Sequence, residues 1–165
     1  MRLRHYISAL DFDRIKTWIT DERTHAMWCA NRFSFPLSRE DFDNVLREHA
    51  EKYGDCPFAA TTDSGEAIGF FCLSTDTGTN SPMLKFVVVS PELRGHGAGF
   101  EMIVLALRYA FGFAKAERVK LCVFAQNEAA RRCYEKVGFT ETSTDKDAFS
   151  YKDETWDRCN MEILK

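Results

Sequence analysis

Apolar residues recur along the chain with helical spacing in its first third, and this spacing predicts two early helices. The first spans residues 9–20, after a candidate cap at Ser8, and its apolar positions are Leu10, Ile15, Trp18 and Ile19. The second spans residues 38–53, where Ser38 stands three residues before Asp41 in a capping-box pattern.

The middle of the chain changes to strand-like patterns and then returns to a helical one. Residues 58–74 form two apolar runs around "TDSGEA", in which Ser64-Gly65 favours a hairpin turn. A third strand is expected from Met83 to Val89. After the segment "SPELRGHGAG", the spacing i, i+3, i+4, i+7 and i+11 predicts a helix through Phe100, Ile103, Val104, Leu107 and Phe111.

The last third predicts a strand over residues 118–125, a short helix over 127–138 and two more strands around a polar loop. In "RCNMEILK", alternation places Cys159, Met161 and Ile163 on one face. The elements alternate with short joins and without repeats, so we expect one mixed α/β domain over residues 1–165. A chain of this length buries about two-thirds of its surface on folding.

Composition narrows the class of partner. The formal net charge of −3 is spread without long like-charged blocks, which gives no basic footprint for nucleic acid and no polybasic membrane anchor. The start "MRLRHYISALDF" has no apolar signal segment, and the apolar stretch "MIVLALRYAFGFA" is interrupted by Arg108 and too short to span a bilayer. We therefore expect a cytoplasmic protein that acts on a small molecule.

The six cysteines show no C-x-x-C pair and lie in apolar surroundings. That pattern is typical of reduced thiols that fill the core, and it favours neither disulfides nor a metal site.

The glycine-rich segment connects a strand to a helix within a predicted β-α-β unit over residues 84–125, which places it at the carboxyl end of a parallel strand. The first N–H groups of a helix have no intrahelical partner, and the helix dipole favours an anion there. Glycines remove the Cβ atoms that would hold a phosphate away, and Arg94 adds a positive charge. The segment predicts a pyrophosphate site; a glycine-rich turn with a solvated arginine is the alternative.

Two common phosphate motifs do not fit this segment. The dinucleotide fingerprint requires G-x-G-x-x-G and an acid near the end of the next strand, whereas this loop reads G-x-G-x-G and the strand ends "CVFAQN". The nucleoside-triphosphate P-loop requires Lys-Ser or Lys-Thr after its last glycine, and Gly99 is followed by Phe100-Glu101. Both kinds of ligand are disfavoured.

Two segments together resemble the GNAT superfamily of acetyl-CoA-dependent N-acetyltransferases. Arg94-x-x-Gly97-x-Gly99 matches that family's (Q/R)-x-x-G-x-(G/A) pyrophosphate motif. "NEAARRCYEKVGF" matches its N-x-x-A-x-x-x-Y-x-x-x-G-F pattern through Asn127, Ala130, Tyr134, Gly138 and Phe139. The match covers roughly residues 84–139. "IKTWITDERTHAMW" and "ETWDRCNMEILK" are also loosely similar to the branch that contains ribosomal-protein N-terminal acetylases and many small-amine acetylases.

The resemblance implies a fold and a set of cofactor contacts. The fold is a mixed sheet of six to seven strands whose central parallel pair splays apart, with about four helices. The exposed edge of the strand at Val87 and Val89 would hydrogen-bond the pantetheine arm of CoA, and backbone N–H groups of the glycine-rich loop would hold the pyrophosphate. Asn127 would contact the pantetheine region, cap the short helix, or do both. The implied cofactor-binding residues are Val87, Val88, Val89, Arg94, Gly95, His96, Gly97, Ala98, Gly99 and Asn127.

Tyr134 is the catalytic residue that the resemblance implies. Attack of an amine on an acetyl thioester expels a thiolate, and a phenol that is neutral at pH 7 can protonate it. The alternative is a core tyrosine packed with Ala130 and Val137. Arg131 and Arg132 could reach the outer phosphates of CoA, but charged pairs on helices are more often solvated.

The sequence does not mark a general base. Some members of the family place a glutamate on the strand before the glycine loop, and "SPMLKFVVV" has no acid. Asp76 or a water chain could serve, although an Asp in "STDTGTN" is more typical of a turn. Nothing beside Cys122 or Cys133 in sequence suggests an activated thiolate.

The resemblance therefore implies an N-acetyltransferase that moves an acetyl group from acetyl-CoA to a primary amine, of a small molecule or a protein N-terminus, by direct attack in a ternary complex. The alternative is a non-catalytic acyl-CoA sensor or protein-interaction module. A homodimer is possible, and no metal is expected. The acceptor cleft would be lined by "THAMWCANRFSF" and "TSTDKDAFSYKDETW", where Trp28, Phe33, Tyr151 and Trp156 line the cleft or pack in the core.

Overall fold

The computed structural model describes residues 1–74 and 80–165. Its strands form one seven-stranded sheet in the order β1-β2-β3-β4-β5-β7-β6. The strands are β1 (Arg2–His5), β2 (Asp55–Thr61), β3 (Ala67–Ser74), β4 (Met83–Val89), β5 (Arg118–Phe124), β6 (Thr140–Tyr151) and β7 (Glu154–Leu164). The α-helices are α1 (Ser8–Ile15), α2 (Glu22–Cys29), α3 (Arg39–Tyr53), α4 (Ala98–Arg108) and α5 (Glu128–Val137). Short 3-10 turns follow α1 and β4, and a π-helical turn extends α4 to Phe113. The predicted mixed α/β fold is confirmed.

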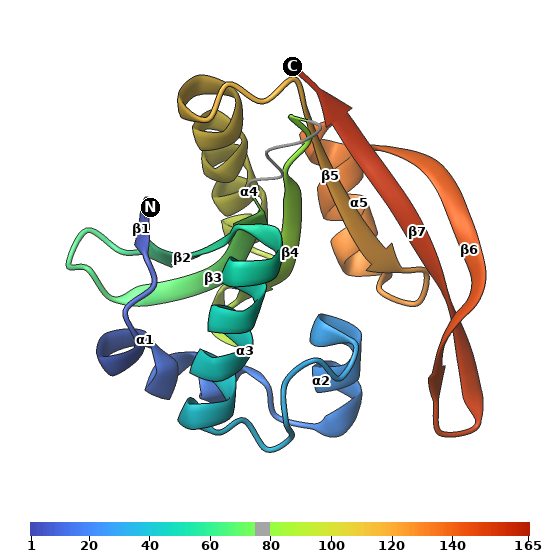
Figure 1. Cartoon of the computed structure of the whole chain (residues 1–165), viewed down its shortest axis with the longest axis horizontal. Coiled ribbons are helices and arrows are strands. Elements are labelled where there is room, and N and C mark those ends of the chain that lie inside the picture. Colours follow the sequence, from blue (N-terminus) through green and yellow to red (C-terminus); the bar gives the residue numbers. More distant parts are fainter. Residues whose placement is uncertain (75–79) are drawn as a thin grey trace.

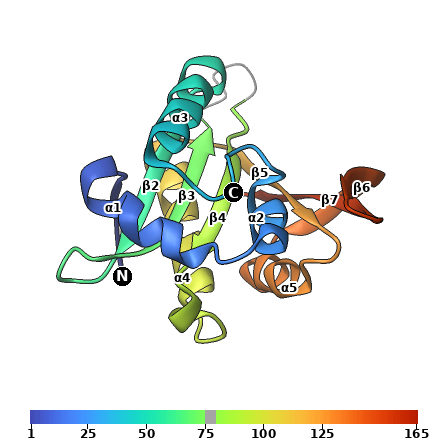
Figure 2. The same ribbon diagram turned by 90° about the horizontal axis from the view of Figure 1, so that it is seen from below.

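Helices cover both faces of the sheet. Seen from below, α4 and α5 lie on one side and α1, α2 and α3 on the other (Figure 2). β3 is an inner strand that is buried on both faces. Successive side chains of a strand point in opposite directions, so its residues contribute to both sides of the sheet. Phe71 and Leu73 pack toward α4, while Phe70 and Cys72 pack toward α1 and α3. Among the described residues the sheet therefore carries one large hydrophobic core beneath each layer of helices, and a third, small cluster of Ala26, Phe124 and Trp156 lies between α2, β5 and β7.

The parallel pair β4 and β5 is joined only at one end. Met83 pairs with Lys120 and Leu84 with Leu121, and these are the two pairs between β4 and β5 among the described residues. Beyond these pairs the two strands diverge (Figure 1). A bulge in β4, at Phe86 with φ of 52°, accompanies a register shift against β3. The predicted splay is confirmed, and it leaves the β5-facing edge of β4 without strand partners.

Most predicted elements lie where the sequence placed them. Gly65, with φ of 87°, turns the β2–β3 hairpin. Ser38 caps α3 by accepting the N–H of Asp41 at 3.2 Å. Alternating residues of β7 face the core as expected, with Cys159 and Met161 buried.

The first predicted helix needs two corrections. Ser8 is not the cap of α1 but its first residue; the cap position belongs to Ile7, and the Ser8 hydroxyl donates to Asp43. Leu10 is 63% exposed and does not join the apolar stripe. The physical reason is that Asp11 and Phe12 face inward, so that Leu10 falls on the solvent side of the same turn.

Two elements were not predicted from the sequence. β1 has only four residues and pairs antiparallel with β2. α2 begins after Asp21, whose side chain accepts the N–H of Thr24 at 2.8 Å, and this cap was the available signal. Residues 1–74 and 80–165 therefore contain five α-helices, where about four were expected. Within the described ranges, no helix is both long and apolar enough to cross a membrane.

Candidate active site

Two cavities meet where β4 and β5 separate. The loop cavity, about 680 Å³, lies against the glycine-rich segment, the start of α4 and one side of α5. The strand cavity, about 1110 Å³, lies between α2, the end of α3 and the diverging strands. Both are lined by Met27, Trp28, Val87, Asn127, Ala130 and Tyr134. A molecule in one cavity would therefore contact a molecule in the other at this shared set of residues.

Alternate residues of the glycine-rich segment face the loop cavity. Gly95, Gly97 and Gly99 line it, whereas His96 and Ala98 are not among its lining residues. Gly97 has φ of 86° and occupies the cap position of α4. A Cβ placed on Gly97 would find no protein atom within 4 Å, so the space in front of it belongs to the cavity.

The start of α4 offers N–H groups to that space. The Glu101 N–H donates to the Gly97 carbonyl at 3.0 Å, which closes the first turn of the helix. The amides that precede it in the turn have no acceptor within the helix, and the helix dipole adds partial positive charge there. This end of the loop cavity therefore suits an anion such as a phosphate.

Arg94 also lines the loop cavity, but its donors face the protein. Its Nη2 donates to the Trp18 carbonyl at 3.2 Å and its Nε to the Val89 carbonyl at 3.4 Å. The side chain thus ties the end of β4 to the 3-10 turn after α1. Val87, Val88 and Val89 of β4 line the same cavity. A phosphate contact of the Arg94 side chain stays a prediction.

Asn127 caps α5 and also borders both cavities. Its Oδ1 accepts the N–H of Ala130 at 3.3 Å. The capping role predicted for it is therefore present, and its position leaves the rest of the side chain available to a ligand. Arg132 lines the loop cavity and pairs with Glu128 at 3.0 Å, while Arg131 donates to Glu141 at 3.2 Å.

Tyr134 projects from α5 to the junction of the two cavities. It is 7% exposed, and its ring meets Phe139 edge to face at 6.0 Å. Within the described residues its hydroxyl makes no hydrogen bond, although the side chain lines both cavities. Burial raises the pKa of Tyr134 well above its ordinary value, so the group stays a neutral phenol. The ring of Tyr134 therefore packs in the core, while its hydroxyl is able to bind a ligand.

The thiols near the cavities are not poised as nucleophiles. Burial raises the pKa of Cys122 and of Cys133. The Cys122 thiol also donates to Asn160 Oδ1 at 3.1 Å. Because the thiolate is the reactive form, neither side chain favours a covalent acyl-enzyme.

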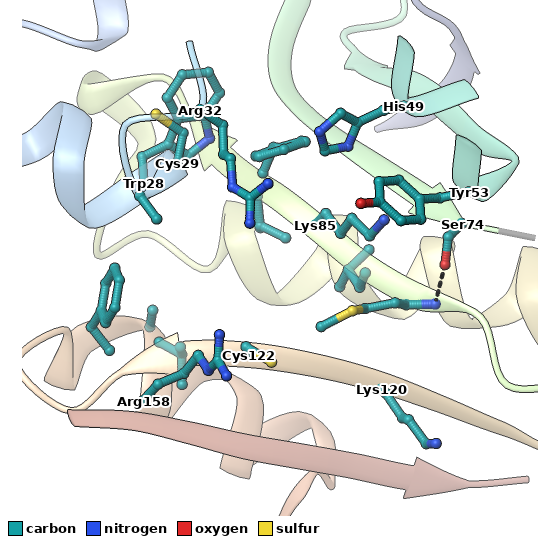
Figure 3. Close-up of a pocket in the computed structure, with 18 of the residues that line it drawn as sticks. Trp28, Cys29, Arg32, His49, Tyr53, Ser74, Lys85, Lys120, Cys122 and Arg158 are labelled. Atoms are coloured by element: carbon teal, nitrogen blue, oxygen red, sulfur yellow. Dashed lines mark hydrogen bonds between the residues drawn. The ribbon is translucent and has the colours of Figure 1, made fainter. Parts of the chain in front are cut away.

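A buried polar cluster at the end of α3 was missed from the sequence. Asp55 is 4% exposed; its two carboxylate oxygens accept from Lys85 Nζ at 2.8 and 3.0 Å, and His49 Nδ1 lies 3.1 Å away. The Tyr53 ring lies 4.4 Å from the Lys85 ammonium. Figure 3 shows His49, Tyr53 and Lys85 together on one wall of the strand cavity. The partners come from α3, β2 and β4, and no sequence spacing brings them together.

Of the four aromatic residues considered for the acceptor cleft, only Trp28 lines the strand cavity. Its Nε1 is buried and has no partner in the described part of the chain, so a ligand could accept from it. Phe33 and Trp156 are buried in the core, and Tyr151 stacks on Trp156 at 4.9 Å. Asp76, considered above as a base, lies outside the described residues.

Comparison with known families agrees with this geometry. Residues 12–139 match the acetyltransferase (GNAT) family, which is more than half of the chain. The chain therefore belongs to the GNAT family of acetyltransferases. The non-catalytic alternative is not favoured, and the similarity to the ribosomal-protein branch stays a prediction.

Individual relatives are more distant. The 5-NmdU N-acetyltransferase of Pseudomonas phage PaMx11 is 29% identical over 102 residues, which cover 61% of this chain and 70% of that protein. A spermidine N-acetyltransferase from Vibrio cholerae, solved with CoA and spermine, superposes with a TM-score of 0.83 at 22% identity, covering 99% and 94% of the two chains. A chimera of the Vibrio cholerae enzyme and hSSAT gives a TM-score of 0.80 at 21% identity, covering 99% and 96%. At this identity the structural likeness concerns the fold.

Proposed function

We propose that this acetyltransferase takes its acetyl group from acetyl-CoA in the loop cavity and passes it directly to a primary amine in the strand cavity. The observation that carries the proposal is the junction of the two cavities at Val87, Asn127 and Tyr134. Donor and acceptor meet there without any covalent link to the protein.

The loop cavity fits the CoA moiety by its shape and polarity. Gly95 and Gly97 leave open space where side chains would stand, and the first N–H groups of α4 face it. Among the described residues the edge of β4 from Val87 to Val89 has no strand partner on the β5 side, so it can hydrogen-bond an extended amide chain. When bound, acetyl-CoA supplies an acetyl thioester. Of the residues that the family resemblance implied, those that line this cavity would hold it: Val87, Val88, Val89, Arg94, Gly95, Gly97, Gly99 and Asn127.

Tyr134 holds the proton that the reaction needs. Its hydroxyl is a neutral donor because burial raises its pKa, and it has no competing partner among the described residues. It lines both cavities, so it can donate to the departing sulfur while the amine approaches from the strand cavity. Cys122 and Cys133 stay protonated, which favours direct transfer over a covalent route.

Binding of the cofactor gives the first test. CoA and acetyl-CoA at about 100 times their Kd should stabilise the protein by about 2.7 kcal/mol and raise Tm by roughly 5–10 °C. ATP and NAD should leave Tm unchanged, because the loop lacks their motifs. Scanning calorimetry with each ligand measures this. Equal stabilisation by ATP, or none by CoA, would remove the basis of the proposal.

A further inference from the structure

The proposed transfer needs a group that takes a proton from the acceptor. A primary amine enters near neutral pH as an ammonium ion, whose nitrogen has no lone pair to attack a thioester. Of the described side chains that line both cavities, only Tyr134 titrates, and it stays a neutral phenol, which donates a proton rather than accepts one. The base therefore has to come from the wall of the strand cavity.

His49 lies on that wall and is fixed by a buried carboxylate. Its Nδ1 lies 3.1 Å from Asp55 Oδ2, and the Asp55 side chain is 1% exposed. Lys85 Nζ donates to both Asp55 oxygens, at 2.8 and 3.0 Å. A carboxylate that accepts from an ammonium through both oxygens acts as an acceptor toward His49 as well.

This contact fixes the tautomer of the imidazole. Because Asp55 accepts, the proton of the neutral ring lies on Nδ1, and Nε2 keeps its lone pair. Among the described residues Nε2 makes no hydrogen bond. Two neighbouring rings hold the imidazole, Tyr53 at 5.2 Å and Phe86 at 5.4 Å between centroids. An unprotonated nitrogen is thus held in one orientation.

The free edge of the ring belongs to the strand cavity. His49 lines this cavity and keeps 13% of its side chain exposed, whereas Asp55 does not line it. Figure 3 shows the His49 ring projecting from α3 into the cavity. Nδ1 is therefore turned to the protein, and the rest of the ring is available to a molecule in the cavity.

His49 lies one aromatic ring beyond the junction of the two cavities. The Phe86 ring is 5.4 Å from His49 and 6.2 Å from Trp28, which lines both cavities. An acceptor in the strand cavity has Tyr134 at the junction and His49 further along the wall. The ammonium loses its proton before it attacks, so Nε2 has to reach the cavity, directly or through one water, and not the thioester.

The charged and titratable groups around His49 suit a base that is used repeatedly. Asp55 stabilises the imidazolium that forms when Nε2 takes a proton. Lys85 binds the same carboxylate, Tyr53 is a phenol on the same helix, and the Arg32 guanidinium reaches into the cavity from the loop after α2 (Figure 3). The two cations oppose a further positive charge, which favours return of the proton to solvent.

We infer that His49 is the general base of this transfer, with Asp55 as its positioning residue. The inference rests on the proposed function. His49 Nε2 takes one proton from the ammonium, and the nitrogen lone pair then bonds to the thioester carbonyl carbon. The carbon–sulfur bond breaks, and the sulfur leaves as a thiol with the proton of Tyr134. The new amide nitrogen returns its surplus proton to Tyr134, and His49 releases its own to solvent.

The test follows CoA release from saturating acetyl-CoA with ethylamine as the acceptor. His49→Ala removes the base and leaves the ion pair of Asp55 and Lys85 intact. It should lower kcat/KM for ethylamine by about 10²–10⁴ near neutral pH, while the CoA dissociation constant changes by no more than a few-fold. Added imidazole should restore part of the lost activity, because it can supply the missing base in the vacated space. A purely structural role would not respond to imidazole.

The pH dependence gives a second measurement. As the pH rises from about 7 toward the pKa of an alkyl ammonium, about 10, more of the ethylamine arrives neutral and needs no base. The deficit of His49→Ala should therefore shrink over this range, in which Tyr134 keeps its proton. His5→Ala is the matched control, since His5 is exposed on β1 and lies outside both cavities, and it should behave like the unmodified protein throughout.

Two results would overturn the inference. One is a His49→Ala protein with full activity near neutral pH, and the other is a deficit that neither imidazole nor rising pH reduces. Failure of the proposed function is a different result, in which the unmodified protein releases no CoA with ethylamine, and it would remove the base together with the reaction.

Discussion

Tyr134→Phe should lower kcat by about 10²–10⁴ while the CoA dissociation constant changes by no more than a few-fold. The substitution keeps the ring, which packs against Phe139, and removes only the hydroxyl. That hydroxyl has no hydrogen-bond partner in the described residues, so its loss leaves no protein group unsatisfied. The deficit should therefore fall on the chemical step, measured as acetyl transfer under saturating acetyl-CoA and amine.

Tyr109→Phe is the matched control. Tyr109 packs in the same core, with its ring 5.0 Å from Phe58, and lines neither cavity. Its kcat should equal that of the unmodified protein. A Tyr134→Phe enzyme with full kcat would make that tyrosine a packing residue only.

The pH profile supplies a second measurement on Tyr134. Burial raises its pKa above the ordinary value of about 10, so the phenol stays protonated through neutral and mildly alkaline pH. Loss of its proton should therefore cause no decline in kcat below about pH 10, and an alkaline decline above that point should weaken or vanish in the Phe variant. A decline that is identical in both proteins would assign it to another group.

The sequence led to the loop cavity because its signals there are local. Gly95, Gly97 and Gly99 stand at alternate positions of one short segment, and the apolar run before it forms β4 from Met83 to Val89. All three line the loop cavity, Gly95 and Gly97 from the turn before α4 and Gly99 from the first turn of that helix. Backbone geometry and spacing are sufficient for this part.

The acceptor side could not be predicted because its residues meet only in the folded chain. Arg32 follows α2, a helix whose sequence signal was a single cap at Asp21. Lys120 lies on β5. Asp55 on β2 binds Lys85 on β4, and β3 lies between these two strands in the sheet. The formal net charge of −3 is a sum over the whole chain and does not show which charged side chains line the strand cavity. Ion pairs between residues that are distant in sequence decide which cations are neutralised. The hydrophobic periodicity of the sequence carries no information about such pairs.

Gly97→Val should abolish CoA binding while the protein still folds. A branched side chain at this position would enter the open space of the loop cavity, where the cap of α4 presents its N–H groups. Loss of two charge-assisted hydrogen bonds, at about 1.5–3 kcal/mol each, would weaken binding by roughly a hundredfold or more.

Backbone strain has to be separated from this effect. Gly97 has φ of 86°, and a left-handed conformation costs a residue with a Cβ about 1–2 kcal/mol. Gly65 provides a matched control, since it has φ of 87°, also has no protein atom within 4 Å of an added Cβ, and turns the β2–β3 hairpin outside both cavities. Gly65→Val should lower Tm by a similar amount and bind CoA normally. Titration calorimetry on both variants, with circular dichroism to verify folding, compares them. If Gly97→Val binds CoA as Gly65→Val does, the glycine-rich segment is only a turn and the loop cavity does not hold the pyrophosphate.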